Sequence, residues 1–155
     1  MNVRSARPTE SEELSALAAS AKALWGYSER QLALWSSELR ISCESIVSEP
    51  TFVAEEHARP VGVAQLDTKT LPWAVECLWV HPSAVGRGVG TLLVHHLLAH
   101  ARANGQSALR VDSDPNAEAF YLHLGARRVG EVAAPIEGQP TRTRPQLMLG
   151  VEHAA

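Results

Sequence analysis

The chain has 155 residues, a formal net charge of −3, 45% hydrophobic residues and 20% charged residues. These values predict a single globular domain over residues 1–155, and they exclude a disordered chain. The negative charge argues against a general nucleic-acid binder. A polar N-terminus and the lack of an apolar run of about 18 residues predict no signal peptide and no membrane span. The two cysteines lack C-x-x-C spacing, which predicts a reducing, cytoplasmic setting.

The first part of the chain predicts a short edge strand followed by helices. Residues 2–7 alternate weakly between polar and apolar side chains. Thr9 and Glu12 form a capping-box pattern at the start of a helix over residues 8–24. A second helix and one further helical turn are expected over 28–39 and within 42–48.

The middle of the chain predicts three consecutive strands, at 51–55, 61–66 and 73–80. A polar turn joins the first two, so they are expected to form an antiparallel hairpin. Side chains alternate along a strand, which divides the third one into two faces. We expect Glu76, Leu78 and Val80 on one face, opposite Trp73, Val75, Cys77 and Trp79.

A glycine-rich segment, Gly86-Arg87-Gly88-Val89-Gly90, follows the third strand and leads directly into an apolar helix pattern over 89–104. The first N–H groups of a helix lack partners and carry positive partial charge, so a strand, a glycine loop and a helix N-terminus form an anion site. Arg87 is expected to add a mobile cation there. The glycine spacing fits neither a P-loop nor a dinucleotide-binding fingerprint.

The last part of the chain predicts three more strands and one short helix. Asn116 is the expected N-cap of that helix, and Gly125 ends it. The strand–helix–strand passage from 73 to 111 implies one parallel pair, whereas the other connections favour antiparallel pairing. The sequence therefore predicts an α/β (α+β) fold with a mixed, mostly antiparallel sheet of about seven strands, flanked by about four helices.

Two segments resemble the motifs of a known family. Gly88 and Gly90, in an x-x-G-x-G pattern after a strand and a V-x-P turn, resemble motif A of the GNAT superfamily of acetyl-CoA-dependent N-acetyltransferases. Val85 stands where that family has Gln or Arg. The segment 116–126, which includes Tyr121, resembles motif B. The predicted order of elements also resembles the GNAT fold along the whole chain.

The resemblance implies direct transfer of an acetyl group from acetyl-CoA, the co-substrate, to an amine, with no metal. In the family, a backbone N–H at a strand bulge binds the thioester carbonyl, which maps to Val80, and the motif B tyrosine, here Tyr121, protonates the departing thiolate. The diphosphate is expected on the backbone of the glycine loop. The expected cofactor contacts are Leu78, Trp79, Val80, Val85, Gly86, Arg87, Gly88, Val89, Gly90, Thr91, Asn116 and Tyr121.

Glu76 is the expected base that deprotonates the acceptor amine, because it interrupts an otherwise apolar strand on the face of Val80. Half-burial there would raise the pKa of the carboxyl group towards the useful range. Glu55, Glu56 or a chain of water molecules are the alternatives. Strand alternation turns Cys77 to the opposite face, so no cysteine nucleophile is expected.

The remaining aromatic and histidine residues allow more than one interpretation. Trp25, Tyr27 and Trp35 either line the acceptor pocket or pack in the core. His96 and His100 have i,i+4 spacing but lack a third ligand, so a solvated helix face is predicted rather than a metal site.

The acceptor is expected to be a small amine, an amino acid or a peptide amine, and the resemblance leaves a homodimer open. Two alternatives to an enzyme remain. One is an acyl-CoA-binding or regulatory module with little catalysis. The other is a nucleotide-phosphate binder that shares the glycine loop alone.

Overall fold

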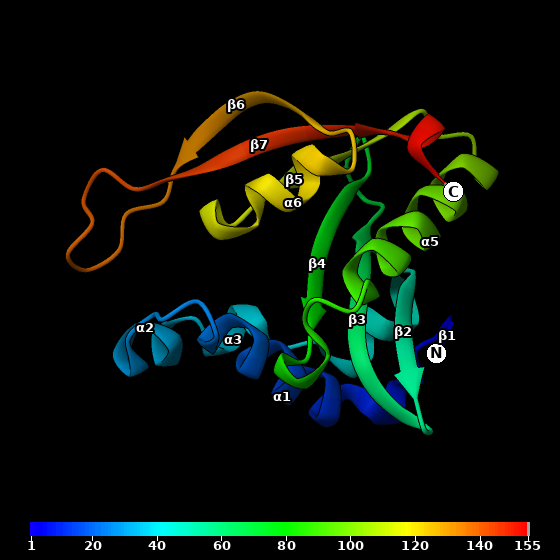
Figure 1. Cartoon of the computed structure of the whole chain (residues 1–155), viewed down its shortest axis with the longest axis horizontal. Coiled ribbons are helices and arrows are strands. Elements are labelled where there is room, and N and C mark those ends of the chain that lie inside the picture. Colours follow the sequence, from blue (N-terminus) through cyan, green and yellow to red (C-terminus); the bar gives the residue numbers. More distant parts are fainter. Residues whose placement is uncertain (155) are drawn as a thin grey trace.

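The computed structural model describes residues 1–154 and contains a seven-stranded sheet in the order β1-β2-β3-β4-β5-β7-β6 (Figure 1). Neighbouring strands are antiparallel, except that β4 and β5 are parallel. The predicted mixed sheet is therefore confirmed. The strands are β1 (Asn2–Ser5), β2 (Thr51–Glu56), β3 (Arg59–Asp67), β4 (Ala74–Val80), β5 (Ala108–Asp112), β6 (Arg127–Ala133) and β7 (Thr143–Gly150).

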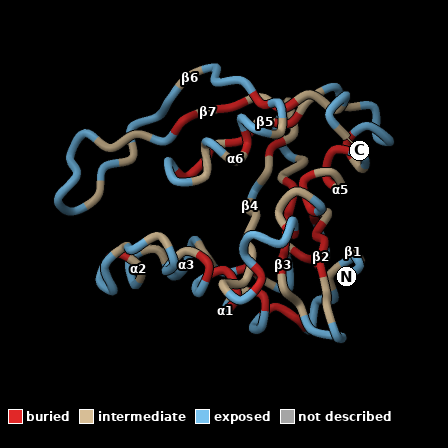
Figure 2. Tube along the Cα trace, in the orientation of Figure 1, coloured by how far each residue is buried: buried red, intermediate tan, exposed pale blue. Residues whose placement is uncertain are grey.

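Two long helices, α1 (Ser11–Ala23) and α5 (Val89–Ala103), cover opposite faces of the sheet. Val53 of β2 packs in the cluster of α1, and the next residue, Ala54, packs in the cluster of α5, as strand alternation requires. Figure 2 shows the buried residues concentrated where α5 crosses β2 and β3. The shorter helices are α2 (Glu29–Leu34), α3 (Ser36–Leu39), α4 (Cys43–Ser48) and α6 (Glu118–His123).

α5 approaches β3 closely because β3 has a glycine at the crossing. A Cβ atom at Gly62 would lie 2.7 Å from Val89 Cγ1 and 2.9 Å from Leu93 Cδ1. Val89 and Leu93 are 1% and 0% exposed, so neither side chain has room to move away. Gly62 thereby sets the distance between the sheet and the N-terminal turns of α5.

We expect Gly62→Ala to lower the free energy of unfolding by about 1–3 kcal/mol, because the added methyl group overpacks this contact. Urea unfolding measures the loss. Gly130→Ala is the matched control in a strand, since its Cβ would meet only the flexible end of Gln146, at 3.1 Å. An equal loss of stability in the two variants would show that the close approach of α5 is not the cause.

β4 and β5 start side by side and then separate (Figure 1). They have a single register pair, Ala74 with Arg110, next to a hydrogen bond of 2.9 Å from the Arg110 N–H to the Trp73 carbonyl. Beyond this point β4 has no partner strand on that side among residues 1–154, so its backbone groups remain free to bind another molecule.

The alternation predicted for β4 is wrong at its centre. β3 pairs first with Val75 and then with Cys77, so Glu76 is the extra residue of a β-bulge. The bulge changes which side chains share a face. Val75, Leu78 and Val80 pack on the side of α5, whereas Cys77 and Trp79 pack on the side of α1.

The first two predicted helices also differ in detail. The chain enters α1 through a 3-10 turn, η1 (Pro8–Glu10), whose N-cap is Arg7. The Glu10 carboxylate accepts a hydrogen bond of 2.8 Å from the Arg7 N–H, and this replaces the capping box predicted for Thr9 and Glu12. The helix predicted over 28–39 is interrupted at Trp35, where α2 ends and α3 begins.

His96 and His100 of α5 are half-buried and lie against aromatic rings, so the face predicted to be solvated is only partly exposed. The Phe52 ring centroid is 4.6 Å from that of His96 and 5.4 Å from that of His100. Burial lowers the pKa of His96, and the neighbouring His100 lowers it further.

Residues 1–154 contain no cluster of three potential metal-ligating side chains. Within the same residues, every helix is too short or too polar to cross a membrane.

Candidate active site

Two cavities meet where β4 and β5 separate. The glycine-loop cavity, about 440 Å³, lies between β4, α6 and the N-terminus of α5. The charged cavity, about 490 Å³, lies between β4, α1, α3 and the loop before β7, and Lys22, Glu76, Asp114, Arg142 and Arg144 line it. The residues common to both cavities are Trp25, Leu78, Trp79, Ala117 and Tyr121. Ligands in the two cavities would therefore meet at these shared residues, which we call the junction.

The glycine-loop cavity presents backbone N–H groups to a ligand. Gly86 and Gly88 have φ angles of +80° and +81°, which side chains of L residues rarely adopt, and a Cβ on either would meet no atom within 4 Å. Gly88 is the N-cap of α5. The N–H groups of the first turn of α5 point towards the loop without helical acceptors, so the loop can bind an anion.

All the residues predicted to bind the cofactor line this cavity except Arg87. Arg87 instead forms an ion pair with Glu56 of β2, which holds the pKa of Glu56 below its usual value. The prediction of a mobile cation in the loop is therefore wrong. The lining residues that the sequence did not reveal are Ala21, Leu24, Trp25, Ala84, Ala117 and Phe120.

The backbone of β4 presents two N–H groups towards the missing partner strand. The His81 N–H donates to the Val61 carbonyl of β3 at 2.8 Å. Because N–H groups of an antiparallel ladder alternate between the two edges, those of Val80 and Leu78 point away from β3. Such donors can polarise a carbonyl group placed beside β4. The resemblance predicts a strand bulge at Val80 as the place where the thioester carbonyl binds. The bulge of β4 lies instead at Glu76.

Tyr121 of α6 lies at the junction, and its side chain is 5% exposed. Its ring packs edge-on against Phe120, with centroids 5.1 Å apart. Burial raises the pKa of the phenol well above its usual value. The hydroxyl group therefore stays protonated at neutral pH and can donate a hydrogen bond or a proton.

Glu76 and Cys77 both line the charged cavity, because the bulge cancels the separation that alternation predicted. Glu76 is exposed, so the predicted half-burial is wrong. Burial and, to a smaller extent, the charge of Glu76 raise the pKa of Cys77 to about 12, so the thiol stays protonated and is a poor nucleophile. The alternative bases Glu55 and Glu56 line neither cavity and pair with Arg4 and Arg87.

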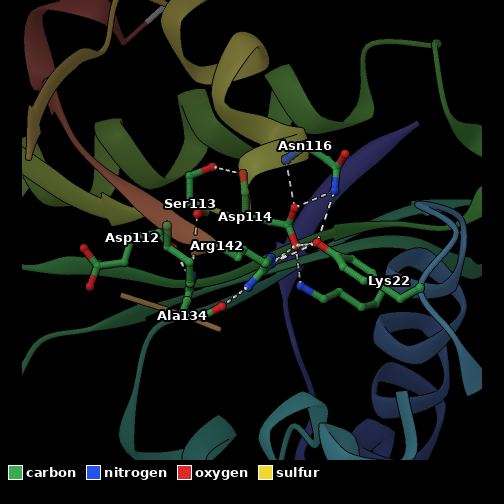
Figure 3. A network of polar contacts seen from close by, with 9 residues as sticks. Lys22, Asp112, Ser113, Asp114, Asn116, Ala134 and Arg142 are labelled. Carbon is green, nitrogen blue, oxygen red and sulfur yellow. Dashed lines mark hydrogen bonds and ion pairs between the residues drawn. The ribbon is translucent and has the colours of Figure 1, made fainter. Parts of the chain in front are cut away.

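A buried network of polar contacts forms one wall of the charged cavity (Figure 3). The carboxylate of Asp114, which is 8% exposed, accepts from Lys22 Nζ at 2.5 Å and from the Tyr27 hydroxyl at 2.9 Å. Arg142 donates to Tyr27 at 2.9 Å and lies 3.5 Å from Asp114. Asp114 also accepts from the Asn116 N–H at 2.8 Å, so it takes the capping role predicted for Asn116.

Four aromatic rings surround the Lys22 ammonium group. Its Nζ lies 4.4 Å from the ring centroid of Trp35, 5.0 Å from Tyr27, 5.5 Å from Trp25 and 5.7 Å from Trp79. These distances are typical of cation–π contacts. Burial lowers the pKa of Lys22, against the opposing effect of Asp114. These four aromatic residues therefore form a cage around the Lys22 ammonium group in the wall of the charged cavity.

The geometry agrees with comparisons to known proteins. The profile of the Acetyltransferase (GNAT) family matches residues 14–126. A GCN5-related N-acetyltransferase from Rhodopseudomonas palustris is 27% identical, with a TM-score of 0.80 over 96% of this chain and 94% of that one. A putative acetyltransferase from Salmonella typhimurium, solved with acetyl-CoA, is 18% identical, with a TM-score of 0.70 over 97% of this chain and 94% of that one.

A third similar structure, the PaiA N-acetyltransferase from Thermoplasma acidophilum in complex with coenzyme A, is 15% identical, with a TM-score of 0.77 over 96% of this chain and 98% of that one. No curated protein matches the sequence. The family profile spans most of the chain, and the residues that it matches include β4, the glycine loop and α5. The chain belongs to the GNAT family of acetyltransferases.

Proposed function

We propose that the protein transfers the acetyl group of acetyl-CoA directly to an amine acceptor. The observation that carries this proposal is the junction of the two cavities, which residues of β4 and the buried side chain of Tyr121 both line. One cavity suits a phosphorylated carrier and the other suits a charged amine. We place the reaction in the cytoplasm, because both cysteines are free thiols.

Acetyl-CoA would enter along the glycine-loop cavity. Its diphosphate would lie on the N–H groups at Gly86 to Gly90, and its pantetheine arm would take the position of the missing strand beside β4. Leu78 lines both cavities, whereas Val80 lines the glycine-loop cavity alone. We therefore assign polarisation of the thioester carbonyl to the Leu78 N–H and binding of the arm to the Val80 N–H.

The acceptor amine would reach the thioester from the charged cavity. Glu76 accepts its proton, directly or through water, because only the neutral amine has a lone pair for attack. The amine nitrogen then bonds to the carbonyl carbon, the carbon–sulfur bond breaks, and Tyr121 donates its proton to the departing sulfur. The proton that the nitrogen loses as it becomes an amide returns to the Tyr121 oxygen, directly or through water. No acetyl group passes through Cys77, since its high pKa keeps the thiol protonated.

Titration with acetyl-CoA, followed by assay of CoA release against a panel of amines, tests the proposal. Thermal stabilisation by acetyl-CoA together with CoA release on at least one amine is the expected result. Stabilisation without CoA release from any amine would favour an acyl-CoA-binding module instead. Competition by ATP or NAD at similar affinity would favour a nucleotide-phosphate binder.

Gly88→Ala is expected to weaken acetyl-CoA binding at least about tenfold, because its Cβ enters the open space assigned to the diphosphate. A left-handed L residue also costs about 1–2 kcal/mol in folding. Gly105→Ala is the matched control, since Gly105 has a φ of +80°, equally open surroundings and a position past the other end of α5. Calorimetry and urea unfolding should show similar losses of stability, with a loss of affinity in Gly88→Ala alone. Unchanged affinity in Gly88→Ala would contradict the phosphate site.

A further inference from the structure

The charged cavity is lined by side chains of both signs of charge. Lys22 of α1, Arg142 of the loop before β7 and Arg144 of β7 lie near one another, since both arginine charges lower the pKa of Lys22, and we call the region around them the cationic end. Glu38 of α3 and Glu76 of β4 line the same cavity, and such a lining favours a ligand that carries both signs of charge. Which of these charges remain available to a ligand depends on the partners that they already have.

At the cationic end, positive charge exceeds negative charge. Asp114 is the carboxylate partner of both Lys22 and Arg142. Asp112 also lines this end, but it pairs with Arg110, at 3.5 Å. Arg144 donates to the backbone carbonyls of Asp112 and Ser113 and has no carboxylate partner within residues 1–154. A guanidinium group has five N–H donors, so Arg144 can still bind an anion.

On α3 and β4, Glu38 and Glu76 line the same cavity and have no ion-pair partner in the described part of the chain. The aromatic cage is already filled by Lys22, so the ammonium group of an acceptor cannot occupy it. An acceptor ammonium group is instead attracted to Glu76, which lies two residues before Leu78 of the junction.

The free cation lies close to the reacting atoms. Arg144 and Tyr121 line the same cavity, and the charge of Arg144 lowers the pKa of Tyr121, against the larger opposite effect of burial. An anionic group held by Arg144 would therefore lie near the acceptor nitrogen, within the reach of one small molecule.

We propose that the acceptor is an amine that also carries a carboxylate group, in the class of free amino acids, and that Arg144 binds this carboxylate. The inference rests on the proposed acetyl transfer. A polyamine would place a second cation against Lys22, Arg142 and Arg144, and a peptide N-terminus would place a neutral amide there. Neither uses the unpaired guanidinium group.

The test compares CoA release from three matched sets of compounds at saturating acetyl-CoA: the common amino acids, their C-terminal amides and the corresponding decarboxylated amines. We expect kcat/KM for the best amino acid to exceed that of its amide at least about tenfold, as a charge-assisted hydrogen bond would give. In Arg144→Gln this ratio should fall towards one. Arg127→Gln on the neighbouring strand β6 is the control, because Arg127 lines neither cavity, and it should keep the ratio of the wild type.

The possible results distinguish the acceptor class, the role of Arg144 and the proposed acetyl transfer from one another. CoA release from amides or simple amines at rates equal to those from amino acids would overturn the acceptor class and leave the acetyl transfer intact. A ratio that survives in Arg144→Gln would overturn the role of Arg144. Acetyl-CoA binding with no CoA release from any of the three sets would overturn the proposed function itself, and the acceptor class with it.

Discussion

Replacement of Tyr121 by phenylalanine is expected to lower kcat about 100-fold or more, with little change in acetyl-CoA affinity or stability. The hydroxyl is the one feature that the substitution removes, and the ring keeps its contact with Phe120. Without that proton the sulfur must leave as an unprotonated thiolate. Steady-state kinetics and calorimetry with acetyl-CoA separate the loss of kcat from a loss of binding.

The other tyrosine of the chain, Tyr27, provides the matched control. Its hydroxyl bonds to Asp114, Asn116 and Arg142, but it does not line the junction. Tyr27→Phe should therefore lower the free energy of unfolding by about 1–3 kcal/mol and should lower kcat much less than Tyr121→Phe. If Tyr121→Phe kept full kcat, the departing sulfur would take its proton from water.

The pH profile provides a second measure of the same role. Burial raises the pKa of Tyr121 above the usual value of about 10 for a phenol. The acid form therefore persists through the neutral and mildly basic range. We expect no loss of kcat on the basic side below a pH of about 10, whereas activity should fall towards lower pH because less of the acceptor is in its neutral, nucleophilic form.

The parts of the fold that local patterns determine could be predicted from the sequence. The apolar runs of β2 and β3, which a polar turn separates, and the period of 3.6 in α5 depend on residues close together in the chain. The glycine loop is also a local feature, because Gly86 and Gly88 alone supply the left-handed angles that the turn into α5 requires. For this reason the loop residues predicted to bind the cofactor do line one cavity, with the exception of Arg87.

The features that depend on a distant partner could not be predicted. The bulge at Glu76 exists because β3 pairs with Val75 and Cys77 in that register, and β4 alone reads as a regular alternating strand. Arg87 is held by a carboxylate 31 residues away. Each of these distant contacts places a charged group differently from the prediction. Glu76 is exposed rather than half-buried, and Arg87 pairs with Glu56 rather than lying free in the loop.

The network around Asp114 illustrates the same limit more strongly. Its members come from α1, from the turn after α1, from the end of β5 and from the loop before β7, and Tyr27 and Arg142 are 115 residues apart. A lysine near the end of α1 is typical of an exposed C-terminal turn. The three-dimensional structure is needed to show that its ammonium group contacts four aromatic rings and a buried carboxylate.

Asp114→Asn is expected to lower the free energy of unfolding by about 3–5 kcal/mol, because it leaves Lys22 and Arg142 buried without a counter-charge. Lys22→Met should cost less, since Arg142, Tyr27 and the Asn116 N–H still satisfy the carboxylate. In the double variant, loss of the Lys22 charge should offset part of the cost of Asp114→Asn. Urea unfolding of the wild type and the three variants gives the coupling energy directly.

Urea unfolding at acid pH tests whether the charged form of Asp114 stabilises the fold. Burial alone would raise the pKa of Asp114, but hydrogen bonds from Lys22 and the Asn116 N–H outweigh it, so the folded-state pKa lies below its usual value of about 3.9. The carboxylate therefore stabilises the fold at neutral pH, and this contribution is lost as the pH falls from about 4 through the folded-state pKa. The difference between the wild type and Asp114→Asn should be constant near neutral pH and should shrink in acid. A small and pH-independent difference would mean that solvent screens this network.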